Sequence, residues 1–271
     1  MSSAEANVAK PTTLSESTIK AHKSVARRLA LIAALGGLLY GYDSAVINGA
    51  TNAIKTEFAT GDALLGLAVG SALISGGIGA LLADRIADKI GRVPMMKIAA
   101  VLFLICSIGC AIVPNIFVLV AFRVFGGFAA GVAAMVAPVY IAEIAPTDER
   151  GVLGAFQQLG IVIGIFISLL VNALLVHISG GASVFMGPLE TWQWMFLCMA
   201  VPSVLYFLLA LTIPESPRYL VAQHRDEEAA VVLGRINGYR IGLNRAEQTG
   251  TGHRRFGTDH CFAFFSPFDT V

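Results

Sequence analysis

Six long apolar blocks, separated by short polar segments, dominate the hydrophobic pattern of this chain. We place them at residues 29–49, 63–83, 95–113, 116–141, 152–176 and 194–213. A helix needs about 20 residues to cross a hydrocarbon core about 30 Å thick, and each block is close to or above that length. Lipid offers the backbone no hydrogen-bond partners, so these segments are expected to be helical. The pattern predicts an all-α membrane protein built as a six-transmembrane-helix bundle.

The composition supports a membrane location. Hydrophobic residues make up 56% of the 271 residues and charged residues 14%, and the mean hydropathy is +0.72. A soluble domain carries roughly 25% charged residues, so this chain has too few to cover a water-facing surface. Residues 1–18 are polar and do not form a signal peptide, so we expect the first block to remain in the membrane. The net charge of +1 gives no sign of a nucleic-acid partner.

Basic residues gather on one side of the predicted spans. They precede the first span and follow the second, fourth and sixth: Lys10, Lys20, Lys23, Arg27, Arg28, Arg85, Lys89, Arg92, Arg150, Arg218 and Arg225. The loops on the opposite side hold Lys55 alone. Because basic loops favour the cytoplasm, both ends of the chain are expected to be cytoplasmic.

The same pattern divides the chain into four parts. Residues 1–28 form a cytoplasmic N-terminal segment, and residues 29–213 form the transmembrane bundle. Residues 214–239 form a cytoplasmic region with a short amphipathic helix at 226–237. Residues 240–271 are polar and lack any period, which predicts an aberrant or disordered tail.

Glycine recurs at helical spacing within the spans. G-x-x-x-G pairs occur at Gly37/Gly41, Gly66/Gly70, Gly127/Gly131 and Gly160/Gly164. This spacing forms a flat stripe on one helix face, which lets neighbouring backbones approach closely. Several such stripes predict a compact bundle, and they also permit a homodimer of this chain.

Two charged residues stand out inside the predicted spans. Asp43 comes near the end of the first span, and Arg123 comes near the start of the fourth. At a rise of 1.5 Å per residue, both lie ~10 Å below the same membrane boundary. Charges at this depth are costly and usually functional, and an acid beside a base could load and release a proton. The alternative is a static ion pair that fixes the positions of the helices.

Gln157 and Gln158 lie early in the fifth span. Adjacent helix positions point about 100° apart, so at most one of the two is expected to face a central cavity. An amide both donates and accepts hydrogen bonds, which suits a hydroxyl-rich ligand. Hydrogen bonding between helices is the alternative role.

Charged residues are dense in the predicted cytoplasmic segments. They comprise Asp84, Arg85, Arg92, Glu143, Arg150, Glu215 and Arg218. By sign and side, Glu143 could pair with Arg92 or with Arg150. Bridges of this kind could hold one conformation and break in another, and the alternative is solvated loop charge.

Three aromatic residues lie near the ends of predicted spans: Tyr140, Trp192 and Trp194. Tyrosine and tryptophan are enriched where the hydrocarbon core meets water. We therefore expect these three side chains to anchor the protein at the membrane interface.

Motifs for enzymatic or metal chemistry are missing from the sequence. The four cysteines, Cys106, Cys110, Cys198 and Cys261, show neither metal-site spacing nor a disulfide framework. The sequence holds no H-E-x-x-H, G-x-S-x-G or P-loop motif. We expect a protein that is not an enzyme and binds neither metal nor cofactor.

Together these features resemble the sugar porter branch of the major facilitator superfamily. The matching stretches are GYDSAVING (41–49), DRIADKIGR (84–92), RVFGG (123–127), PVYIAE (138–143), RG (150–151), QLG (158–160) and PESPR (214–218). They follow the family's order, and the resemblance covers roughly residues 26–239.

The resemblance implies a twelve-helix transporter that works by alternating access, with a substrate site between two six-helix halves. Asp43 matches the acid of the proton-coupled members, Arg123 its partner arginine, and Gln158 the family's sugar-binding glutamine. The expected function is proton symport of a sugar or cyclic polyol, such as a hexose, pentose or inositol, across the plasma membrane. This chain matches the N-terminal half, so the alternative is a non-transporting half that needs a C-terminal partner half.

Overall fold

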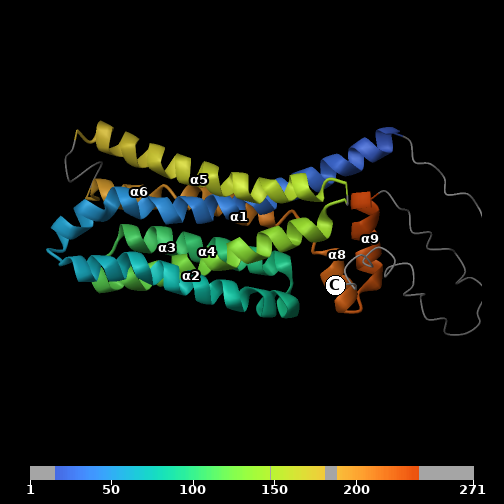
Figure 1. Cartoon of the computed structure of the whole chain (residues 1–271), viewed down its shortest axis with the longest axis horizontal. Coiled ribbons are helices and arrows are strands. Elements are labelled where there is room, and N and C mark those ends of the chain that lie inside the picture. Colours follow the sequence, from blue (N-terminus) through green and yellow to red (C-terminus); the bar gives the residue numbers. More distant parts are fainter. Residues whose placement is uncertain (1–15, 147, 181–187, 238–271) are drawn as a thin grey trace, which may run out of the picture. The chain divides into compact units, whose positions relative to one another are not determined.

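The computed structural model describes residues 16–146, 148–180 and 188–237, and these ranges fold into nine α-helices (Figure 1). The helices are α1 (Glu16–Glu57), α2 (Asp62–Ile90), α3 (Arg92–Ala111), α4 (Ile116–Ile144), α5 (Arg150–Ile178), α6 (Thr191–Leu197), α7 (Ala200–Ala210), α8 (Pro217–Ala222) and α9 (Asp226–Asn237). Six helical segments in the described ranges, with α6 and α7 counted together, are long and apolar enough to cross a membrane. The predicted all-α bundle of six spans is therefore confirmed, whereas the expected tail at 240–271 lies outside the described residues.

The first and sixth spans depart from the prediction in different ways. Helix α1 begins at Glu16, well before the apolar block, because the polar residues 16–28 contain neither glycine nor proline and continue the helix. The sixth span is divided at Cys198 and Met199 into α6 and α7. Pro202 has no N–H to offer the carbonyl of Cys198, and its ring crowds that carbonyl, so the regular ladder is interrupted there.

The starts of two helices are stabilised by local capping. The Asn115 side chain accepts a hydrogen bond from the backbone N–H of Val118 at 3.0 Å, which satisfies one of the unpaired donors at the start of α4. Glu190 and Gln193 form a reciprocal capping box at the start of α6. These side chains satisfy backbone groups that would otherwise be unpaired at the two helix starts.

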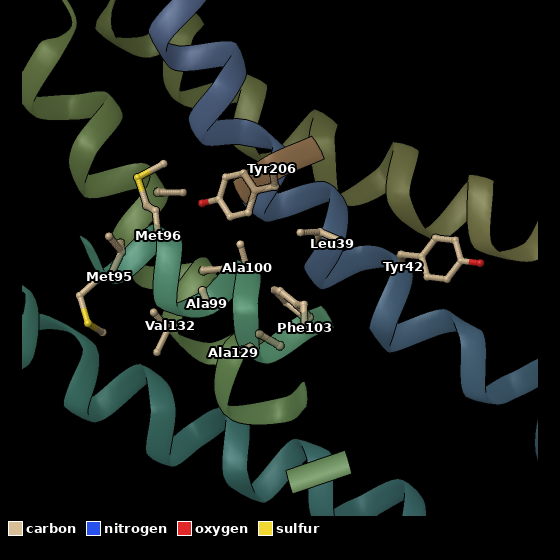
Figure 2. Packing of buried hydrophobic residues seen from close by; sticks show 14 of the residues in the cluster. Leu39, Tyr42, Met95, Met96, Ala99, Ala100, Phe103, Ala129, Val132 and Tyr206 are labelled. Carbon is tan, nitrogen blue, oxygen red and sulfur yellow. The ribbon is translucent and has the colours of Figure 1, made fainter. Parts of the chain in front are cut away.

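The bundle core lies among α1, α3, α4 and the α6–α7 span. Phe103 of α3 is fully buried, as are Leu39 of α1 and Ala129 of α4. Figure 2 shows these three residues in one apolar cluster with Met96 of α3 and Tyr206 of α7. Burying a large apolar side chain contributes about 1.5–3 kcal/mol where it is removed from water; within lipid, the gain comes from close packing.

Helices α2 and α5 are packed on one side only. Helix α2 packs against α4 and α5 packs against α1, yet the apolar window of α5 is only 17% buried. Leu73 and Leu81 of α2 are more than two-thirds exposed, at 72% and 77%. Both helices therefore present a broad apolar face to their surroundings.

Glycines bring two pairs of helices together. A Cβ at Gly41 of α1 would meet the Ile161 carbonyl of α5, and a Cβ at Gly131 of α4 would meet the Gly76 carbonyl of α2. Such contacts require a residue without a side chain. Gly66 is different, because a Cβ there would meet nothing within 4 Å in the described structure. Gly70 is equally open, so the stripe expected from the Gly66/Gly70 pair makes no close helix contact.

Two of the three expected interface aromatics are core residues. Trp192 is 1% exposed, and its indole N–H donates to Glu190 Oε2 at 2.8 Å. Tyr140 is fully buried, and its hydroxyl donates to the Pro214 carbonyl at 2.8 Å. The belt prediction is wrong for both, because each polar atom finds a partner inside the protein and the ring can then be buried. Trp194 is partly exposed.

Candidate functional site

Asp43 and Arg123 form a buried ion pair between α1 and α4. Arg123 Nη1 donates to Asp43 Oδ1 at 2.6 Å, and each side chain is 3% exposed. The two residues lie at a common depth, as predicted, and α1 and α4 are rotated so that their side chains meet. The contact leaves open which of the two roles, proton carrier or static bridge, the pair has.

Other side chains enclose this pair. The Arg123 guanidinium carbon lies 5.8 Å from the centre of the Phe196 ring, a cation–π distance. Gly126, one turn after Arg123, leaves room for Cys106 of α3 beside Asp43. The sequence interpretation missed Phe196, Gly126 and Cys106, because their placement depends on how α3, α4 and α6 are rotated.

The two charges of the pair compensate each other. An unpaired buried charge is far costlier than a paired one, and breaking a buried pair typically costs about 3–5 kcal/mol. The Asp43 carboxylate supplies the charge that compensates Arg123. Arg123 Nε has no hydrogen-bond partner within the described residues, so the guanidinium has little other compensation. Arg123 therefore depends on Asp43 for most of its charge compensation.

A cavity of about 360 Å³ lies between α1, α2 and α4 and reaches both charges. Tyr40, Ser44 and Asn48 of α1 contribute polar groups to its lining, and small residues of α2 and α4 form the opposite wall. The Ser44 hydroxyl donates to the Tyr40 carbonyl at 2.8 Å. Water or a small polar molecule can thus come close to the ion pair.

The two glutamines of α5 point to different sides. Gln157 is buried against Gly37 of α1, and neither of its amide atoms has a hydrogen-bond partner within the described residues. Gln158 is exposed. The two side chains therefore diverge, as adjacent positions of a helix do.

Part of the predicted charge network assembles at one end of the bundle. Arg92 Nε lies 3.3 Å from Glu143 Oε2, so Glu143 pairs with Arg92, and no ion pair joins it to Arg150 among the described residues. Glu215 Oε1 accepts the backbone N–H of Arg92 at 3.0 Å and thereby caps α3. Ser216 donates to Glu143 at 2.5 Å, a contact that the sequence interpretation missed.

Other members of the predicted network remain apart. Asp84 and Arg85 are exposed on α2, and no ion pair involves either of them in the described part of the chain. Arg218 lies within the short helix α8. The structure therefore joins Arg92, Glu143 and Glu215 and leaves Asp84 and Arg85 as surface charges.

A second ion-pair cluster, which the sequence interpretation did not identify, joins α1 to the segment before α5. Lys23 forms an ion pair with Asp148, and Arg27 contacts Glu149 through two bonds of 2.8 and 3.1 Å. The hydrogen bonds from Lys23 and Arg27 lower the pKa values of Asp148 and Glu149, respectively. One indication of this cluster was present in the sequence, because the start of α1 and the segment before α5 were both predicted to lie on the cytoplasmic side.

Comparisons with known proteins agree with this architecture. The sequence profile of the family described as "Sugar (and other) transporter" matches residues 29–250. The "Glucose transport protein" of Synechocystis is 46% identical over 209 residues, which cover 76% of this chain and 45% of that protein. The "D-xylose-proton symporter" of Escherichia coli K12 is 35% identical over 246 residues, covering 81% of this chain and 50% of that protein.

A solved structure gives the same result. The xylose transporter XylE from E. coli, in a partially occluded inward-open conformation, superposes with a TM-score of 0.73 at 34% identity, covering 83% of this chain and 56% of that one. This chain thus spans about half the length of the relatives that it matches.

Proposed function

This chain belongs to the sugar transporter family of the major facilitator superfamily, and we propose that it forms one half of a proton-coupled symporter for a sugar or cyclic polyol. Transport follows alternating access, in which two six-helix halves rock around a central substrate site. The chain supplies the proton-coupling residues and part of the sugar site. The observation that carries this proposal is the buried contact between Asp43 and Arg123.

Proton coupling is the role we assign to that contact. Asp43 carries the proton, and Arg123 compensates the carboxylate when the proton leaves. The cavity beside both residues gives protons a polar approach from one side. A static bridge would need no such access, so the cavity favours the coupling role.

Sugar binding is assigned to Gln158, which is exposed on α5. An amide there can both donate to and accept from sugar hydroxyls. Gln157 is buried against α1, so we assign it a supporting role beside the site. The exposed faces of α2 and α5 suit contact with a complementary C-terminal half, which would enclose Gln158. A non-transporting half that acts only with such a partner is the second candidate.

We place the transporter in the plasma membrane with both termini in the cytoplasm. The support is the basic residues that lie at one end of the bundle, among them Lys23, Arg27 and Arg92. Positively charged loops favour the cytoplasmic side. Protease protection of tagged termini in sealed inverted vesicles tests this orientation.

Uptake by purified protein tests the transport proposal. The chain is reconstituted alone, and also together with a C-terminal half of the Synechocystis glucose transport protein, whose N-terminal part it resembles. Radiolabelled glucose, xylose and inositol are offered under an inward proton gradient. Uptake that the gradient drives, in either preparation, supports the proposal, and uptake by the pair alone supports the partner-half candidate. Gradient-independent uptake would exclude symport, and absence of uptake from both preparations would exclude transport of these solutes.

A further inference from the structure

Cys106 and Cys110 of α3 form a pair of fully buried thiols. Their sulfur atoms lie 3.9 Å apart. The two residues are four positions apart, so both side chains lie on the same face of the helix. Both cysteines are free, since a disulfide bond of about 2 Å would require the sulfurs to move much closer. Two thiols are thus held side by side in the helix core.

The thiol pair lies next to the buried charges. The Cys106 sulfur is the atom nearest the position that a Cβ would occupy on Gly126, and Asp43 Oδ1 lies 3.4 Å from that position. Arg123 is close enough to both sulfurs for an electrostatic interaction. Because Asp43 and Arg123 line the cavity of about 360 Å³, a small ion that enters this cavity comes close to Cys106.

The available donors select a soft ion that needs few ligands. Protein thiolates bind Cu(I), zinc and iron–sulfur clusters. Structural zinc takes four ligands and iron–sulfur clusters take four cysteines, whereas no third His, Cys, Asp or Glu joins the two thiols in the part of the chain that the structure describes. Cu(I) is satisfied by two sulfurs. With thiolate–metal bonds of about 2.3 Å, the length found for zinc, sulfurs 3.9 Å apart can bridge one ion.

We propose that Cys106 and Cys110 form a binding site for Cu(I). The ion displaces both thiol protons: two S–H bonds break, two S–Cu bonds form, and the protons leave to water through the cavity. The resulting bis-thiolate complex carries one negative charge, and Arg123 is near enough to compensate it. The sequence showed no spacing typical of zinc, and a site made of two thiols does not need one. Binding of the ion is independent of what the protein transports.

Occupation of the site has a consequence for Asp43 that rests on the proposed function. The negative complex competes with the Asp43 carboxylate for the Arg123 guanidinium, because both anions lie beside one cation. An uncompensated charge in a buried site is costly, so Asp43 retains a proton while Cu(I) is bound. Cu(I) would therefore block the proton release that symport requires.

Competition for Cu(I) in the full chain tests the site. The variant Cys198→Ser/Cys261→Ser keeps the pair as its only cysteines, and Cys106→Ser/Cys110→Ser, which keeps the other two thiols, is the matched control. Each detergent-purified protein is titrated with Cu(I), without oxygen, against the coloured chelator bathocuproine disulfonate, and Zn²⁺ serves as the second probe. Cys106→Ser and Cys110→Ser are also introduced singly. X-ray absorption at the copper edge counts the sulfur ligands in the protein that keeps the pair, so this measurement does not depend on how a thiol-pair variant folds.

We expect one Cu(I) per chain, bound by two sulfurs, in the protein that keeps the pair. Either single substitution should weaken binding about 100-fold or more, because the second thiol acts at a high effective concentration. Binding to the matched control as tight as to the pair would overturn the site, as would a copper spectrum with a single sulfur ligand. Binding of Zn²⁺ as tight as that of Cu(I) would overturn the assignment to a soft ion with two ligands.

These binding measurements decide the site even if the chain transports nothing. In a preparation that does transport, Cu(I) should abolish sugar-driven proton movement when the pair is present and leave it unchanged in the matched control. Bound Cu(I) that leaves proton movement through the pair-containing protein unchanged would overturn the effect on Asp43.

Discussion

Gly126 of α4 lies where the structure leaves no space for a side chain. A Cβ at this position would be 3.1 Å from Cys106 Cβ and 3.4 Å from Asp43 Oδ1, and closer still to the Cys106 sulfur. Carbon atoms in contact prefer about 3.5–4.0 Å. Asp43 is held by Arg123 at 2.6 Å, and Cys106 is fully buried, so Gly126→Ala must push α3 and α4 apart or disturb the ion pair.

The size of the effect follows from these contacts. Adding a methyl group to a well-packed interior typically costs about 1–3 kcal/mol. Alanine also favours a helix over glycine by up to about 1 kcal/mol, and the control Gly66→Ala includes that gain without a clash, since nothing lies within 4 Å of its Cβ. We expect Gly126→Ala to lower the free energy of unfolding by about 1–3 kcal/mol relative to Gly66→Ala.

Chemical unfolding in detergent, followed by tryptophan fluorescence, measures this difference. The double variant Gly126→Ala/Cys106→Ala removes the sulfur that lies nearest the added methyl group, so part of the stability should return. We expect a coupling of at least about 0.5 kcal/mol in the double-mutant cycle, as found for residues in contact. A Gly126→Ala protein as stable as Gly66→Ala, or a cycle with zero coupling, would refute this account of the packing.

Three further predictions concern contacts at the ends of helices. Tyr140→Phe should lower stability by about 1–3 kcal/mol, because it leaves the part-buried Pro214 carbonyl without its hydrogen bond. Tyr219→Phe is a milder control, because the hydrogen bond of Tyr219 is exposed. Thermal unfolding that shows the same loss of stability for both variants would contradict this prediction. Glu215→Ala should cost about 0.5–2 kcal/mol through loss of the α3 cap, and the same assay showing no change would contradict the capping role. Because Arg27 lowers the pKa of Glu149 below that of a free glutamate, their pair should stabilise the fold at neutral pH and lose this contribution as the pH falls through the lowered pKa. A stability advantage over Glu149→Gln that does not decline on acidification would disprove this.

Hydropathy was sufficient to predict the spans, because a segment in lipid must satisfy its own backbone hydrogen bonds. It could not predict helix ends that lie outside the apolar blocks. Residues 16–28 are polar, so the early start of α1 had no hydropathy signal. The break in the sixth span follows from Pro202, which disrupts the helix locally. A hydropathy pattern does not register this effect, although the proline itself is visible in the sequence.

The depth of the candidate site residues in the membrane could be predicted from the sequence, but the direction in which their side chains point could not. Rise per residue placed Asp43 and Arg123 at one level, but their contact depends on the rotation of α1 and α4 about their axes. Glycine contacts between helices set that rotation, and their partners are far apart in the sequence. The same limit applies to Gln157 and Gln158, since the 100° between them showed that they diverge without showing which one is buried.

Partner choice at the helix ends was also beyond the sequence. The signs of their charges and their common side of the membrane allowed Glu143 to pair with Arg92 or with Arg150. In the folded structure Glu143 pairs with Arg92. Tyr140 and Trp192 illustrate a related error. Their positions near span ends fit an interfacial belt, whereas their hydrogen bonds to Pro214 and Glu190 place them in the interior.

Sugar-driven proton movement tests the central claim most directly. Proteoliposomes that hold the transporting preparation, with the complementary half where it is needed, are monitored with a pH-sensitive dye as sugar is added outside. We predict that the external medium becomes alkaline with the wild-type chain and with the exposed-residue control Asp226→Asn, and that Asp43→Asn gives no pH change. Proton uptake by Asp43→Asn equal to that of the wild type would contradict the assignment of the proton to the pair that Asp43 forms with Arg123.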